Sequence, residues 1–150
     1  MSEALVIEAV RKSVTVDCTV EEAFRIFTAD AHTWWPTATH SVHGDKVTRI
    51  VFEEREGGEL YEVSESGEKG HWARVVTWDP PHRLVLAWNI LEAEPVPTEV
   101  EVRFATIEGK TRVELEHRGW DALHERGAEK RASYDTGWGS VLGKYAERAG

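Results

Sequence analysis

The sequence has little sulfur and no long apolar run. Its single cysteine, Cys18, excludes an internal disulfide and a metal cluster built from thiolates. The first ten residues include Glu3 and Glu8 and lack the apolar stretch of a signal peptide or a membrane span. We therefore expect a cytoplasmic protein.

Positive charge is also scarce. The 18 Lys and Arg residues face 27 Asp and Glu residues, which gives a formal net charge of −9. Duplex nucleic acid and anionic membranes require a positive face on their partner, so we expect neither as a partner. The length of 150 residues suits one domain, spanning residues 1–150, with its own core.

Tryptophan, by contrast, is abundant. The chain has seven Trp residues against four Phe and three Tyr. Trp is large and amphipathic and is seldom fully buried. This set predicts either a bulky core or a cavity with aromatic walls.

Hydrophobic periodicity predicts an α+β domain. Residues 5–17 alternate as a strand does, and Thr19 with Glu22 three residues later marks the start of a short helix. A second helical turn over 30–35 ends before Pro36, and a polar loop covers 37–46. Six strand-like runs follow, separated by turn residues, at 47–54, 59–65, 71–79, 83–91, 98–107 and 110–119.

The last two strands have a defined register. If Glu108-Gly109 is a two-residue hairpin turn, charged side chains share one face of the pair and apolar side chains share the other. His117 then falls on the covered face, opposite Val100. Glu101 meets Glu116 on the other face, which predicts a small repulsion.

Beyond residue 121 the period becomes helical. The stretch 128–148 carries one apolar stripe, formed by Tyr134, Trp138, Val141, Leu142 and Tyr145. Gly137, Gly139 and Gly143 allow a close approach to the sheet or leave room beside the helix. The expected architecture is a curved seven-stranded antiparallel sheet wrapped around the long C-terminal helix, with two short helices after the first strand and a cavity inside.

Five segments together resemble one family. They are V-F-E-E-R-E-G-G-E-L-Y-E (51–62), W-D-P-P-H-R-L-V-L-A-W (78–88), T-E-V-E-V-R-F (98–104), T-R-V-E-L-E-H-R-G-W (111–120) and Y-D-T-G-W (134–138). The resemblance is to the START-like (SRPBCC) superfamily, in the group of homologues of the heat-shock chaperone ATPase activator. It implies a helix-grip fold around a hydrophobic cavity. Members of the superfamily include lipid and plant-hormone carriers, polyketide cyclases and antibiotic-sequestering proteins.

From the aromatic residues and the resemblance we expect a small hydrophobic or aromatic ligand, polyketide- or lipid-like, and no cofactor. The candidate apolar wall is formed by Trp34, Trp35, Trp72, Trp88, Tyr134 and Trp138. Three polar residues fall on predicted inward positions and form its candidate polar end: Glu62, Arg74 and His117. An alternative interpretation is an internal Arg74–Glu62 ion pair, with His117 bonded to the backbone or to Tyr134.

Two other functions are alternatives to ligand binding. His117 and Glu62 could act as general acid and base in a cyclase-like or hydrolytic enzyme, although we expect binding rather than catalysis. Regulation of a chaperone ATPase is the third hypothesis. In the resembling group that activity belongs to larger proteins with an additional N-terminal domain, so a chaperone partner is the least expected. A homodimer is left open.

A metal site is the last alternative considered. His32, His40, His43 and Asp45 lie close together in the sequence, and two His with a carboxylate can hold a metal ion. Their spacing fits no known signature, so we expect solvated histidines and no metal.

Overall fold

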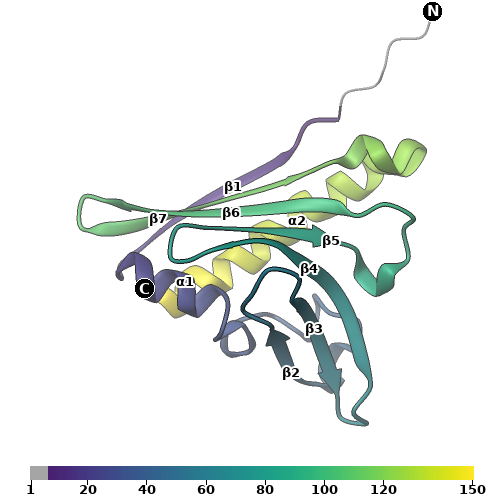
Figure 1. The fold of residues 1–150 in the computed structure, drawn as a ribbon, viewed down its shortest axis with the longest axis horizontal. Helices are drawn as coiled ribbons and strands as arrows, with labels where there is room; N and C mark the ends of the chain where they lie inside the picture. The colour runs from purple at the N-terminus through teal and green to yellow at the C-terminus, as the bar shows by residue number, and fades with distance from the viewer. Residues whose placement is uncertain (1–6) are drawn as a thin grey trace, which may run out of the picture.

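The computed structural model describes residues 7–150, and its elements follow the predicted order (Figure 1). The start of the predicted first strand, residues 5 and 6, lies outside the described residues. The strands are β1 (Val10–Val16), β2 (Val47–Phe52), β3 (Glu59–Ser64), β4 (Lys69–Asp79), β5 (Arg83–Trp88), β6 (Thr98–Ile107) and β7 (Lys110–Arg118). The α-helices are α1 (Val20–Phe27) and α2 (Gly127–Ala149), and the 3-10 helices are η1 (Ala31–Thr33), η2 (Gly44–Lys46), η3 (Ile90–Glu92) and η4 (Trp120–Arg126).

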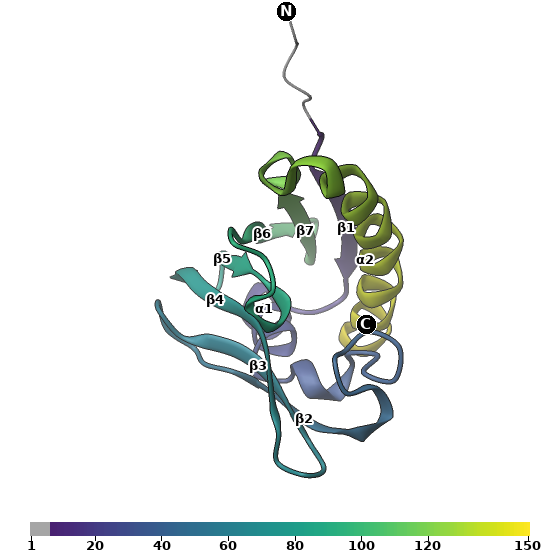
Figure 2. The same cartoon turned by 90° about the vertical axis from the view of Figure 1, so that its right-hand side faces the viewer.

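The seven strands form one antiparallel sheet in the order β1-β7-β6-β5-β4-β3-β2. The sheet curls around α2, which lies along its β1 end, and α1 sits within the curve (Figure 2). This is a helix-grip fold, as predicted. The register of the last hairpin is also confirmed, with Val100 opposite His117 and Glu101 opposite Glu116.

The expected repulsion between Glu101 and Glu116 is wrong, because an arginine lies between the two carboxylates. Nη1 of Arg118 donates to Glu101 Oε1 at 2.6 Å and to Glu116 Oε2 at 2.9 Å. Arg83 and Arg103 donate to the other oxygen of Glu101, at 2.5 and 2.8 Å. Burial alone would raise the pKa of Glu101, but the three arginines lower it to about 2. The outer face of the sheet is therefore held together by a shared carboxylate.

Strand β4 contains two bulges, and they change which side chains face inward. In the first bulge, Trp72 is the extra residue, because His71 and Ala73 on either side of it pair with successive residues of β3. In the second bulge, Val76 is the extra residue, because Val75 and Thr77 pair with successive residues of β5. The alternation predicted that Trp72, Arg74 and Val76 share the inner face. The prediction is wrong for Arg74, which is exposed, and for Val76, which is 48% exposed. Each bulge shifts the alternation by one residue.

The predicted helices begin and end close to the residues expected from the sequence. The hydroxyl of Thr19 accepts a hydrogen bond from the Glu22 N–H at 3.2 Å and caps α1. The predicted helical turn over 30–35 is the shorter η1, which ends before Pro36. Helix α2 begins one residue before the predicted start, and η4 ahead of it was not predicted.

The predicted strand over 83–91 ends early, at Trp88. The side chain of Asn89 donates to the Glu94 carbonyl at 2.9 Å and accepts from the Glu94 N–H at 3.0 Å, which closes a loop that leaves the sheet. Leu91 within this loop has a φ of 57° and is 53% exposed. The loop therefore forms a rim beside the sheet rather than an extension of it.

The core lies between the concave sheet and the two α-helices. Of the predicted stripe of α2, Trp138, Val141, Leu142 and Tyr145 are buried, and Tyr134 is partly buried. No helix within residues 7–150 combines the length and the apolar character needed to cross a bilayer.

Candidate functional site

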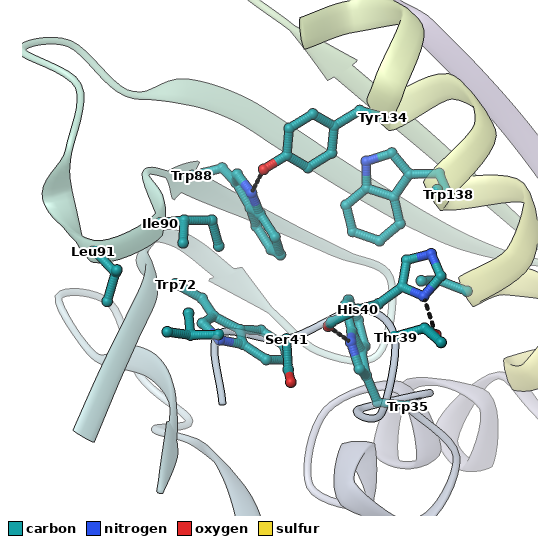
Figure 3. A pocket seen from close by; sticks show the side chains of 13 residues that line it. Trp35, Thr39, His40, Ser41, Trp72, Trp88, Ile90, Leu91, Tyr134 and Trp138 are labelled. Carbon is teal, nitrogen blue, oxygen red and sulfur yellow. Dashed lines mark hydrogen bonds between the residues drawn. The ribbon is translucent and has the colours of Figure 1, made fainter. Parts of the chain in front are cut away.

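A half-enclosed cavity of about 400 Å³ opens between α2, the loop of residues 89–94 that contains η3 (the η3 loop) and the loop of residues 39–42 (Figure 3). This volume is within the usual range for small-molecule sites. Its wall is predominantly apolar. The lining residues are Trp35, Thr39, His40, Ser41, Val42, Trp72, Trp88, Ile90, Leu91, Tyr134, Gly137, Trp138 and Val141.

The four indoles of the wall pack against one another. The ring centroids of Trp35 and Trp72 are 4.8 Å apart, and those of Trp88 and Trp138 are 5.4 Å apart. The remaining space beneath them, toward β5 and β6, is only about 10 Å³. The indoles therefore fill the space inside the curve of the sheet, and the cavity that could hold a ligand lies at the open edge of that space.

Each of these four indoles donates its N–H to the protein. The acceptors are the His40 carbonyl for Trp35, Glu62 Oε1 for Trp72, the Tyr134 hydroxyl for Trp88 and His117 Nδ1 for Trp138, at 2.6 to 3.0 Å. Burial without a partner would be costly for these groups, and none incurs that cost. The wall is thus preformed, with its ring planes fixed by hydrogen bonds.

Two polar groups of the wall keep hydrogen-bonding capacity for a guest. The Tyr134 oxygen accepts from Trp88 at 3.0 Å, and its own hydrogen has no acceptor among the described residues. Nδ1 of His40 lies 2.7 Å from the Thr39 hydroxyl, which leaves Nε2 without a partner in the part of the chain that the structure describes. Ser41, in contrast, is engaged by Thr37 and Gly44. A bound molecule therefore meets a hydroxyl and an imidazole in an otherwise apolar wall.

Glu62 lies behind the wall and is fully buried. Its Oε1 accepts from the Trp72 indole at 2.6 Å and from the Val42 N–H at 2.8 Å. Its Oε2 accepts from the His43 N–H and ring Nδ1, at 2.8 and 2.7 Å. Burial raises the pKa of Glu62, but these hydrogen bonds outweigh burial and leave the pKa below its usual value. One carboxylate thus joins a tryptophan of the wall to the loop that borders the pocket.

His117 is also fully buried, and it is not among the residues that line the pocket. Its Nδ1 accepts from the Trp138 indole at 3.0 Å, so the neutral ring carries its proton on Nε2, which donates to the Thr98 hydroxyl at 2.7 Å. Burial lowers the pKa of His117 to about 3. Both ring nitrogens are occupied, so this histidine orients Trp138 instead of facing a ligand.

The structure brings together five of the nine predicted site residues. Trp35, Trp72, Trp88, Tyr134 and Trp138 line one pocket. Trp34 is buried in the core and donates to the Ile26 carbonyl at 2.7 Å. Arg74 is exposed and away from the pocket wall, so the considered Arg74–Glu62 ion pair does not form. Glu62 and His117 support the wall from behind. A role of any of these residues in binding stays a prediction.

Sequence reasoning missed most of the rim. These residues come from loops, where no periodicity marks a buried face: Thr39, His40, Ser41, Val42, Ile90 and Leu91. Val141 was assigned to the apolar stripe of α2 but not to a site. Gly137 could have indicated the pocket from sequence alone. A glycine inside a helix destabilises it relative to alanine, so its presence suggests that the space beside it is needed. A Cβ atom there would lie 3.7 Å from Cδ2 of His40.

The considered metal ligands do not converge. The expectation of solvated histidines is wrong for His43, because its Nδ1 pairs with the buried Glu62 and its Nε2 lies 3.5 Å from Glu68 Oε2. Within residues 7–150, no group of three or more His, Cys, Asp or Glu side chains is arranged to hold a metal ion. His32 and Asp45 are exposed.

Several solved structures are similar to this chain. The anthrahydroquino-γ-pyrone synthase Txn09 is 36% identical, with a TM-score of 0.59 over 85% of this chain and 86% of that protein. CalC, a self-sacrificing resistance protein from Micromonospora echinospora, is 29% identical, with a TM-score of 0.67 over 95% and 94%. The Aha1 dimer from Colwellia psychrerythraea is 17% identical, with a TM-score of 0.70 over 95% and 96%, a likeness of fold alone.

None of the curated proteins compared with the chain matches it. The family described as activator of Hsp90 ATPase homolog 1-like protein matches residues 17–149, which is nearly the whole chain. The helix-grip fold and the resemblance seen in the five sequence segments agree with this match. The chain belongs to the activator of Hsp90 ATPase homolog 1-like family, within the START-like superfamily.

Proposed function

We propose that this protein binds a flat, largely apolar aromatic molecule of the polyketide class in the pocket between α2, the η3 loop and the loop of residues 39–42. The observation that carries the proposal is the wall of four indoles and Tyr134 around about 400 Å³. Aromatic rings offer large contact area at a small cost in side-chain entropy, because their conformations are already fixed by packing and hydrogen bonds.

The name of one relative supports the aromatic class of ligand, and the name of a second is consistent with a protein that acts on a small molecule. Txn09 is named as a synthase of an anthrahydroquinone-pyrone, and an anthrahydroquinone is a flat tricyclic system. CalC is named as a resistance protein. A flat phenolic guest would also use the two polar groups of the wall, donating to or accepting from His40 Nε2 and accepting from the Tyr134 hydroxyl.

The alternative functions have less support in the geometry. Acid–base catalysis by His117 and Glu62 would need these groups at the pocket, and both are fully buried with their hydrogen-bonding atoms occupied. Regulation of a chaperone ATPase has no feature of the described residues to favour it. Ligand binding is therefore the function that we propose.

Calorimetric titration with 1,8-dihydroxyanthraquinone tests this function. We expect saturable one-to-one binding, and stronger binding than that of dodecanoate, a linear lipid-like compound. Gly137→Leu places a branched side chain toward His40 inside the pocket and should abolish binding. Gly139→Leu is the matched control, since no atom lies within 4 Å of a Cβ at this exposed position of the same helix. Absence of saturable binding, or equal binding by the two variants, would refute the proposal.

A further inference from the structure

A second cavity, of about 210 Å³, adjoins the first. The two cavities share the lining residues Trp88, Ile90, Leu91 and Tyr134, so they adjoin one another. The second cavity extends away from the indole cluster, toward the start of α2. Its other lining residues are Asn89, Ala93, Glu94, Thr98, Trp120, Leu123 and Lys130.

The second cavity differs from the first in its charge. The Glu94 carboxylate is paired with both terminal nitrogens of Arg126, and the hydrogen bond from Arg126 together with the nearby Lys130 charge lowers the pKa of Glu94. One negative charge thus stands beside two positive charges.

Lys130 is exposed, and it is the one charged side chain lining this cavity that forms no ion pair within residues 7–150. The amide of Asn89 is fully used on the backbone of Glu94, and the Thr98 hydroxyl bonds to His117 and to the Trp88 carbonyl. For Lys130, no carboxylate within residues 7–150 lies at ion-pair distance. An anionic group entering the cavity would supply that partner.

We propose that the second cavity receives an acidic arm, a carboxylate carried by the aromatic molecule whose rings occupy the first cavity. The inference rests on the proposed function and adds a chemical requirement to it. The rings lie against the indoles, the arm passes beside Trp88 and Tyr134, and the carboxylate meets the ammonium group of Lys130. A neutral arm of the same size would fit the space but could not form an ion pair with Lys130.

The experiment compares three anthraquinones that differ only in the arm: none, a short chain ending in a carboxylate, and the same chain ending in a primary amide. We expect the carboxylate to bind the unchanged protein most tightly. Lys130→Ala should weaken the carboxylate by about two- to fivefold and leave the armless compound unchanged, as for an exposed ion pair. The advantage of the carboxylate over the amide should shrink at high salt.

Two further variants separate the possible results. Ala93→Phe fills the second cavity and should weaken both compounds with an arm but not the armless compound. Lys144→Ala, at a position of the same helix that is paired with Glu147 and lines neither cavity, should change none of the three affinities. Binding of the armless compound with no gain from the carboxylate would overturn the acidic arm and leave the proposed function standing. Failure of all three compounds to bind would overturn both.

Discussion

The indole of Trp72 and the carboxylate of Glu62, on neighbouring strands β4 and β3, are joined by a hydrogen bond of 2.6 Å. Trp72 is the extra residue of a β-bulge, and bulges often re-aim a side chain next to a functional site. Because the same carboxylate also holds the backbone of Val42 and His43, the pocket wall and the adjoining loop share one buried support.

Glu62→Gln tests this support. A carboxylate can accept all four hydrogen bonds that Glu62 receives, whereas an amide turns one accepting oxygen into a donor that faces N–H groups. We expect the free energy of unfolding to fall by about 2 kcal/mol or more, since buried donors lose their acceptor. Urea unfolding measures the change. Glu65→Gln, at an exposed position nearby, is the control and should have almost no effect.

Gly70→Ala should destabilise the protein through the same carboxylate. A Cβ at position 70 would lie 3.0 Å from Cγ of Glu62 and 3.3 Å from Cε1 of His43. Glu62 is held by four hydrogen bonds and cannot easily move aside, so we expect a loss of about 1–3 kcal/mol. In a Glu62→Ala background the same substitution should cost much less. Equal losses in both backgrounds would show that the side chain of Glu62 does not set the requirement for glycine.

Stability in acid should depend on Glu101. Its pKa is about 2 in the folded protein against an ordinary value of 4.5, so its contribution is present above about pH 4.5 and is lost as the pH falls toward 2. We expect Glu101→Gln to cost about 1–3 kcal/mol at neutral pH and to flatten the loss of stability below pH 4.5. Thermal unfolding across this range measures both effects. Glu114→Gln, exposed on the same face, should follow the unchanged protein.

The buried His117 should make the free energy of unfolding depend on pH in a higher range than Glu101 does. Its pKa is about 3 when folded, against about 6.5 in an unfolded chain, so the unfolded state binds more protons between these values. The free energy of unfolding should therefore fall as the pH drops below about 6.5, by at most about 1.4 kcal/mol per pH unit. His117→Gln can still donate to Thr98 and accept from Trp138, and it should lack this decline. Urea unfolding between about pH 7 and pH 5 measures it, with His82→Gln, exposed at a turn, as the control. A parallel decline in His117→Gln would assign the effect to other groups.

Much of the fold could be predicted from the sequence, because its signals are local. The capping pair at Thr19 and Glu22 and the turn at Glu108-Gly109 define their elements within a few residues. The register of the last hairpin follows from that turn together with the alternation of apolar and charged side chains. The stripe of α2 follows in the same way from the helical period.

The parts that could not be predicted depend on distant contacts. Arg74 was assigned inward because a bulge leaves no mark in an alternating pattern, and the bulge at Trp72 is set by the neighbouring strands. The arginines around Glu101 come from three different strands, so their meeting depends on strand order. For the candidate site, the aromatic wall was largely predicted, whereas His40 and Leu91 lie in loops without a period.

The internal bonding of the four indole N–H groups has a consequence for selectivity. A guest gains nothing from these donors, so the indoles recognise its outline and its contact area alone. Sites of this kind discriminate weakly between compounds that differ by one added hydroxyl group. The protein should therefore accept a series of related planar molecules, with Tyr134 and His40 ranking the members within it.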